Sequence, residues 1–123
     1  MKTARRFTAM GSLVLFGSAI LHTVGYVPLL RKIQGAAIAH PLDQLLKACW
    51  LALSVLFLTL GVIALVARKM DRGGLLVLLC AASAVVTAVL LLCFLGPFPG
   101  VYLLAVVTLL LLIGGWLQAK QPA

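Results

Sequence analysis

The sequence predicts an all-α integral membrane protein in which four transmembrane helices form an up-down-up-down bundle. Hydrophobic residues make up 64% of the 123 residues and charged residues only 10%. The mean hydropathy of +1.23 lies far above that of a soluble domain. A chain of this length is long enough for one bundle but too short for a bundle and a separate soluble domain of typical size. We therefore expect a single transmembrane domain over residues 1–123.

Four apolar segments stand close to the ~20 residues that a spanning helix needs. Gly35 and Pro41 lie between the first two segments. The second segment is followed by three cations and a glycine pair, with Asp71 as a candidate N-cap. The third is followed by GPFPG. Tyr102 and Trp116 flank the fourth as interface anchors. The predicted spans cover residues 7–30, 45–67, 74–95 and 101–117. Because the loops are short, we expect consecutive helices to be antiparallel neighbours.

Cationic residues predict the orientation. Seven of them fall on one side of this topology: Lys2, Arg5, Arg6, Arg68, Lys69, Arg72 and Lys120. Three fall on the other side: Arg31, Lys32 and Lys47. Positive residues favour the cytoplasm, so we expect both termini there, in a bacterial inner membrane. The first 19 residues also resemble a cleavable signal peptide, but we expect them to remain as the first span.

The net charge of +8 does not indicate nucleic-acid binding, because the cations flank apolar spans where topology and anionic lipid explain them. The three cysteines, Cys49, Cys80 and Cys93, stand alone in apolar stretches with no zinc-like spacing. We interpret them as small apolar side chains at helix contacts and predict no metal site.

Small residues indicate faces where helices approach closely. Cys80, Ala84 and Ala88 share one face of the third span, and Gly17 and Gly25 flank His22 on the first. Such faces serve either packing within the bundle or association with another membrane subunit or a second copy. Together with the lipid bilayer, these are the partners that the sequence predicts.

His22 is the most informative candidate site residue. It lies eight residues before Leu30, about 12 Å from the predicted edge of the span and close to the middle of the membrane. Ser18 and Tyr26 stand four residues to either side and form a polar stripe with it. One interpretation is a neutral imidazole that bonds Ser18, a backbone carbonyl, or a polar group on another helix such as Thr59 or Thr108. The other is an axial ligand of haem or chlorophyll, or a proton-carrying group.

His40 lies at the predicted start of a helix rather than within a span. Pro41 suits the first turn of a helix, and Asp43 and Lys47 form an i,i+4 pair there. We expect His40 at the helix cap and in water. It is a weaker candidate ligand, because it differs in depth from His22 by about 12 Å or more.

The length and the four spans resemble those of small multidrug-resistance exporters, whose first helix carries a membrane-embedded glutamate. The chain has no acidic residue in any predicted span, since Asp43 and Asp71 belong to loops. It has no Ser/His/Asp set, phosphate loop or paired carboxylate, so we do not expect an enzyme. An accessory or structural subunit of a larger membrane complex is the first hypothesis. A cofactor-binding electron-transfer or pigment subunit using His22 is the second, and a small transporter is the third.

Overall fold

The computed structural model describes residues 2–36 and 39–120, and those ranges are helical apart from short turns. The helices in that part of the chain are α1 (Lys2–Val24), α2 (Tyr26–Gly35), α3 (His40–Ala67), α4 (Gly74–Leu95) and α5 (Pro99–Ala119). Four helical stretches are long and apolar enough to cross a membrane, with α1 and α2 together forming the first, Lys2–Gly35. This confirms the predicted fold class of an all-α membrane protein.

A break at Gly25 separates α1 from α2. Pro28 has no N–H to bond the carbonyl of Val24, four residues earlier, and its ring crowds that carbonyl. Helical hydrogen bonding continues on both sides of the break, from Gly25 N to the Leu21 carbonyl at 2.9 Å and from Leu29 N to the Gly25 carbonyl at 3.2 Å. The two helices therefore form one interrupted rod.

The helix boundaries differ from the predicted spans where charged residues flank them. Helix α3 begins at His40 rather than at residue 45, and α4 coincides with the predicted 74–95. The predicted ion pair between Asp43 and Lys47 is present, with Lys47 Nζ 2.7 Å from an Asp43 carboxylate oxygen. The prediction of Asp71 as the N-cap of α4 is wrong, because Gly73 occupies that position and no side chain caps the helix.

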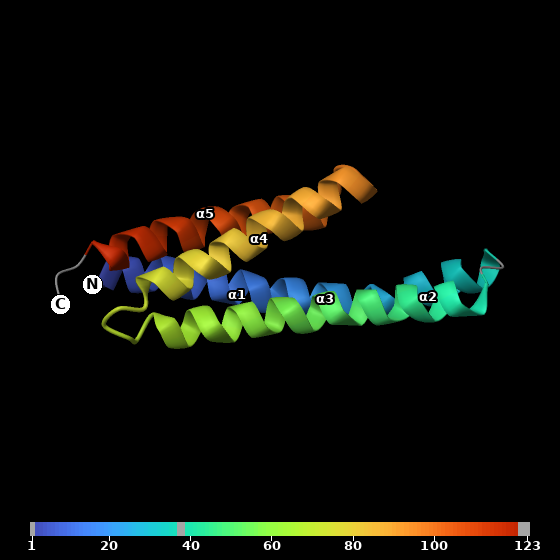
Figure 1. Cartoon of the computed structure of the whole chain (residues 1–123), viewed down its shortest axis with the longest axis horizontal. Helices are drawn as coiled ribbons and strands as arrows, with labels where there is room; N and C mark the ends of the chain where they lie inside the picture. Colours follow the sequence, from blue (N-terminus) through green and yellow to red (C-terminus); the bar gives the residue numbers. More distant parts are fainter. Residues whose placement is uncertain (1, 37–38, 121–123) are drawn as a thin grey trace.

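The helices form two hairpins that diverge from a common end (Figure 1). Helix α1 packs against α3 and α5, and α4 packs against α5, whereas α3 and α4 make far fewer contacts. Both described ends of the chain and the α3–α4 loop lie at the end where the hairpins meet (Figure 1). The order around the bundle is α3, α1, α5, α4, with its open side between α3 and α4.

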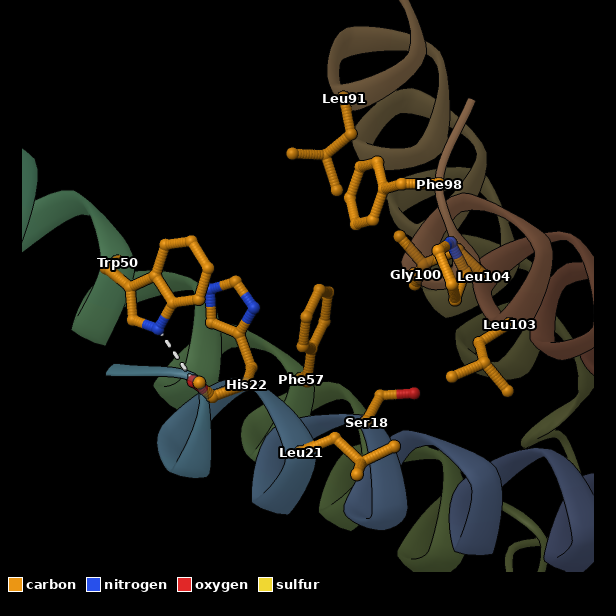
Figure 2. Close-up of a pocket in the computed structure, with 12 residues that line it drawn as sticks. Ser18, Leu21, His22, Trp50, Phe57, Leu91, Phe98, Gly100, Leu103 and Leu104 are labelled. Carbon is orange, nitrogen blue, oxygen red and sulfur yellow. Dashed lines mark hydrogen bonds between the residues drawn. The ribbon is translucent and has the colours of Figure 1, made fainter. Parts of the chain in front are cut away.

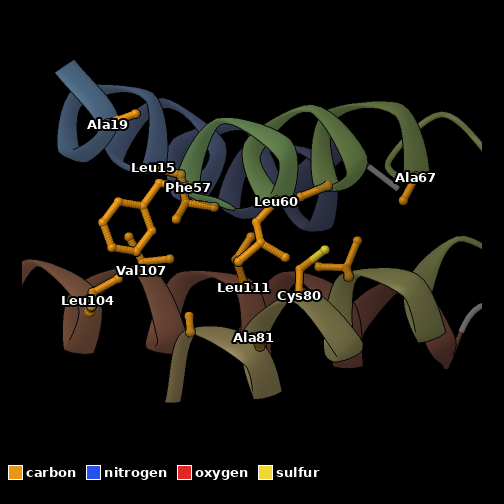
Figure 3. Packing of buried hydrophobic residues seen from close by; sticks show 13 residues of the cluster. Leu15, Ala19, Phe57, Leu60, Ala67, Cys80, Ala81, Leu104, Val107 and Leu111 are labelled. Carbon is orange, nitrogen blue, oxygen red and sulfur yellow. The ribbon is translucent and has the colours of Figure 1, made fainter. Parts of the chain in front are cut away.

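The apolar core lies between the two hairpins (Figure 3). Leu15 of α1 and Leu111 of α5 are fully buried, and Phe57 of α3 is 4% exposed. The Gln118 side chain closes the narrow end, where its Nε2 donates to the carbonyls of Ala67 at 3.1 Å and Met70 at 2.9 Å. This amide from α5 thereby bonds the carbonyls of the last residue of α3 and of the turn that follows, which also accept the backbone N–H groups of Met70 and Gly73.

Glycines let the helices approach closely at several crossings. A Cβ at Gly114 of α5 would lie 2.5 Å from Thr8 Oγ1 of α1, and one at Gly11 would lie 2.7 Å from Leu111 Cδ2. The predicted small-residue face of α4 is internal, because Ala84 is fully buried. At Gly17, by contrast, an added Cβ would meet no atom within 4 Å.

Candidate functional site

The His22 ring is held between aromatic side chains of α3. It stacks on Trp50, with ring centroids 4.1 Å apart and planes 10° apart. Phe57 meets it edge-on, with centroids 5.8 Å apart. Trp50 also donates from Nε1 to the main-chain carbonyl of His22 at 2.6 Å (Figure 2). Two aromatic contacts and one hydrogen bond therefore fix the imidazole relative to α3.

The two ring nitrogens of His22 have different surroundings. Nε2 is buried and has no hydrogen-bond partner among the described residues. Figure 2 shows one ring nitrogen turned toward Trp50 and the other turned away from it, on the side of Phe57 and Phe98. The second is Nδ1, the nitrogen bonded to the ring carbon that carries the side chain. The imidazole thus has one enclosed nitrogen and one that faces the gap between the hairpins.

None of the side chains expected to bond His22 does so. Ser18 donates its hydroxyl to the Val14 carbonyl at 2.8 Å, and Thr59 donates to the Val55 carbonyl at 2.8 Å. Thr108 Oγ1 is itself buried without a partner in the described part of the chain. The Ser18 and Thr59 hydroxyls thus bond their own helices, as Ser and Thr in helices often do.

A cavity of about 340 Å³ lies beside His22, within the range of small-molecule sites. Ser18 and His22 are the polar side chains that its lining brings together, apart from the Trp50 indole N–H already bonded to His22. The remaining lining is apolar, and it comes from both hairpins: Leu21, Gly25, Phe57, Leu91, Phe98, Pro99, Gly100, Leu103 and Leu104. The divergence of the hairpins therefore creates an apolar pocket with an imidazole in its wall.

The cavity lies at the level of the turn between α4 and α5. Phe98, Pro99 and Gly100 line it and belong to the turn between α4 and α5 and its first helical residues. Helix α4 has 22 residues, about 33 Å, which is long enough to cross a hydrocarbon layer ~30 Å thick. The Lys2–Gly35 rod of 34 residues is about 51 Å long, more than the thickness of that layer, so the depth of His22 in the bilayer stays a prediction.

The other predicted site residues lie elsewhere. His40 is exposed and is the first residue of α3, rather than its cap. It precedes Trp50 by ten residues, about 15 Å along the helix, so the structure does not bring it to His22. Tyr26 is half-buried at the start of α2 and is not among the residues that line the cavity. Of the predicted polar stripe, the cavity joins only Ser18 to His22.

The geometry does not suit coordination of a haem or chlorophyll macrocycle. Such a bond needs an unobstructed imidazole nitrogen, usually Nε2, and this atom of His22 is enclosed by protein. In the part of the chain that the structure describes, no group of three or more His, Cys, Asp or Glu side chains could hold a metal ion.

A second hollow lies on the open side of the bundle, between α3 and α4. It has a volume of about 860 Å³ and an almost wholly apolar lining. Leu91 lines both this groove and the His22 cavity, so the two adjoin. The groove residues are Cys49, Ala52, Leu53 and Leu56 of α3 and Thr87, Leu90, Leu91, Phe94 and Leu95 of α4.

Sequence reasoning missed the aromatic surroundings of His22. Trp50 lies 28 residues from it, and no local pattern indicates that the two rings stack. A tryptophan one turn after Lys47 is typical of a membrane interface, and this signal could have placed Trp50 near the surface. Whether Phe98 lines the cavity depends on how far the hairpins diverge, and no local sequence pattern indicates that distance.

Comparisons with family models, with curated proteins and with solved structures find no match for this chain. The function is therefore inferred from the geometry of the site.

Proposed function

We propose that the chain is a membrane-embedded binding subunit, which holds a lipid-phase molecule beside His22 and serves a larger membrane assembly. The observation that carries the proposal is the imidazole in the wall of an apolar cavity of about 340 Å³. A polar group in hydrocarbon surroundings is costly unless it has a partner. Nε2 is enclosed and has no partner among the described residues, whereas Nδ1 faces the gap between the hairpins (Figure 2), where a bound molecule would supply a partner.

A matched pair of substitutions tests this binding role. Ser18→Phe places a bulky side chain in the cavity, whereas Ser83→Phe places the same side chain on an exposed position of α4. Both serines donate to the carbonyl four residues earlier, so both variants lose the same type of bond. Each protein is purified in mild detergent and extracted with organic solvent, and co-purifying molecules are identified by mass spectrometry.

We expect one molecule to be enriched in the native protein and in Ser83→Phe and depleted in Ser18→Phe. Circular dichroism and sizing confirm that each variant is folded. An identical set of molecules in all three proteins would contradict a binding role for the cavity.

The accessory role draws support from the open side of the bundle. Phe94 of α4 is 82% exposed, and the neighbouring side chains of α3 and α4 are apolar. Membrane helices associate through packing against such surfaces. Crosslinking in cells, followed by sizing and mass spectrometry, should recover a complex with a second copy or a larger membrane subunit. A chain that stays monomeric in bilayers, with no crosslinked partner, would contradict the accessory role.

The proposal includes an orientation, with both termini in the cytoplasm of a bacterial cell and the His22 cavity near the opposite membrane surface. Support comes from the clustering of seven cations at one end of the bundle, where α1 begins, α3 meets α4 and α5 ends. Positive residues are enriched in cytoplasmic segments.

A further inference from the structure

We infer that the molecule held beside His22 is a quinone, with its ring in the cavity and its hydrophobic chain in the groove between α3 and α4. This inference rests on the proposed binding function and names the class of ligand. Three features of the site support it: the surroundings of the two imidazole nitrogens, the absence of charge in the lining, and the direction of the groove.

The enclosed nitrogen indicates which tautomer His22 adopts. A buried N–H without a partner is rarer in proteins than a buried acceptor without one. Because Nε2 is enclosed and unpaired, the neutral tautomer that leaves Nε2 bare and places the proton on Nδ1 costs less. Nδ1–H then donates toward the side where Phe57 and Phe98 lie (Figure 2). The matching group on a ligand is an acceptor, such as a carbonyl oxygen.

The lining indicates a neutral, flat head group. No charged residue is among the side chains that line the cavity, so a carboxylate or phosphate would be desolvated there without a counter-ion. Trp50, Phe57 and Phe98 supply aromatic surfaces, against which a planar ring packs in stacked or edge-on contact. A quinone ring combines a flat shape, neutrality and carbonyl acceptors.

The groove has the position that a lipid-soluble chain needs. It begins beside Leu95, at the α4 end near the membrane surface, and extends inward to Thr87, eight residues or about 12 Å deeper. On α3 it extends from Cys49 to Leu56, about 10 Å. A molecule with its head at the His22 cavity and its chain in this groove therefore has the same orientation as the surrounding lipid.

Trp50 provides the measurement, because its ring stacks on His22 and lines the cavity. Trp116→Phe leaves Trp50 as the single tryptophan. The protein, freed of lipid and placed in phosphatidylcholine nanodiscs, is titrated with decylubiquinone, and quenching of the Trp50 emission is recorded. The matched protein with Trp50→Phe retains only Trp116, on an exposed position of α5, and reports the quenching caused by quinone dissolved in the lipid.

We expect saturable quenching of Trp50 near one quinone per chain and only unsaturable quenching of Trp116. His22→Phe, which keeps an aromatic ring but has no N–H, should raise the Kd about tenfold, the effect of losing one hydrogen bond. Equal quenching curves for the two tryptophans, or an unchanged Kd in a folded His22→Phe variant, would overturn the inference.

The chain groove is tested separately. Ala52→Phe obstructs the groove, and Ala82→Phe adds the same ring to an exposed position of α4 outside it. We expect Ala52→Phe to weaken binding of decylubiquinone but not of the same quinone without the decyl chain, and Ala82→Phe to affect neither. Equal effects of the two substitutions would overturn the placement of the chain.

Competition distinguishes the quinone from other lipids. Decanoate and lysophosphatidylcholine have chains but lack the neutral ring, so we expect neither to displace decylubiquinone at an equal concentration. Displacement by either would overturn the inference of a quinone. If Ser18→Phe depletes a different co-purifying molecule and quinone does not bind, the binding function stands and the quinone assignment fails.

Discussion

Trp50 contacts His22 twice, through ring stacking at 4.1 Å and through a hydrogen bond from its indole N–H to the His22 carbonyl at 2.6 Å. The two contacts fasten α1 to α3 at the level where the hairpins diverge. Removing both should therefore cost more than removing one. Trp50→Phe keeps an aromatic ring for stacking and loses only the hydrogen bond.

We expect Trp50→Phe to lower the free energy of unfolding by about 1 kcal/mol and Trp50→Leu by about 2 kcal/mol, given the usual size of one hydrogen bond and one aromatic pair. Denaturation of the protein in mixed micelles measures both values. Trp116→Phe, at an exposed position, is the control and should change little. Equal losses at positions 50 and 116 would show that these contacts do not stabilise the bundle.

Gln118 should stabilise the narrow end of the bundle. Its Nε2 donates to two carbonyls beyond its own helix, those of Ala67 and Met70. We expect Gln118→Leu to lower the free energy of unfolding by about 1–2 kcal/mol, since hydrogen bonds in membrane proteins are individually modest. Gln44→Leu, an exposed substitution of the same type, is the control. A Gln118→Leu variant as stable as the control would contradict this assignment.

Gly114 should tolerate no larger residue. Its added Cβ would lie 2.5 Å from Thr8 Oγ1 and 2.9 Å from Thr8 N, so α1 and α5 would have to separate. We expect Gly114→Ala to cost about 1–3 kcal/mol of unfolding free energy, the usual range for overpacking. Gly17→Ala, where the space is open, should be neutral or slightly stabilising. The opposite ranking of the two variants would refute the α1–α5 packing.

The orientation can be measured with cysteines at Gln34 and Arg72, in a protein without Cys49, Cys80 and Cys93. These positions lie near opposite ends of the bundle. With cytoplasmic termini, an impermeant thiol reagent added to intact cells should label position 34 and not position 72. Labelling of position 72 alone would reverse the orientation.

The spans were predictable because a helix that crosses the hydrocarbon layer needs a long run of apolar residues, which is visible in the sequence. Hydropathy does not indicate where a helix begins or ends. Lys and Arg are good helix formers, so α1 and α2 continue beyond the first predicted span, through Arg5 and Arg31. Helix α3 likewise begins at His40, before the predicted start at residue 45. The predicted edge at residue 30 therefore lies within the helical stretch Lys2–Gly35.

The site was predictable only as far as His22 itself. A histidine in an apolar span is unusual enough to be noticed in the sequence. Its contacts with Trp50 and Phe57 depend on the register in which α1 packs against α3, which the predicted topology leaves open although it makes the two helices neighbours. The predicted neighbours α3 and α4 diverge instead, and their divergence produces both the cavity and the groove.

In the proposed function, the His22 imidazole faces a molecule bound in the cavity. The most direct test uses ¹⁵N-histidine NMR of a His40→Gln protein, in which His22 is the only histidine. Adding the molecule identified in the extraction experiment should shift the His22 nitrogen resonances in this protein but not in its Ser18→Phe derivative. Unchanged resonances in the protein with an open cavity, at saturating concentrations of that molecule, would contradict the account.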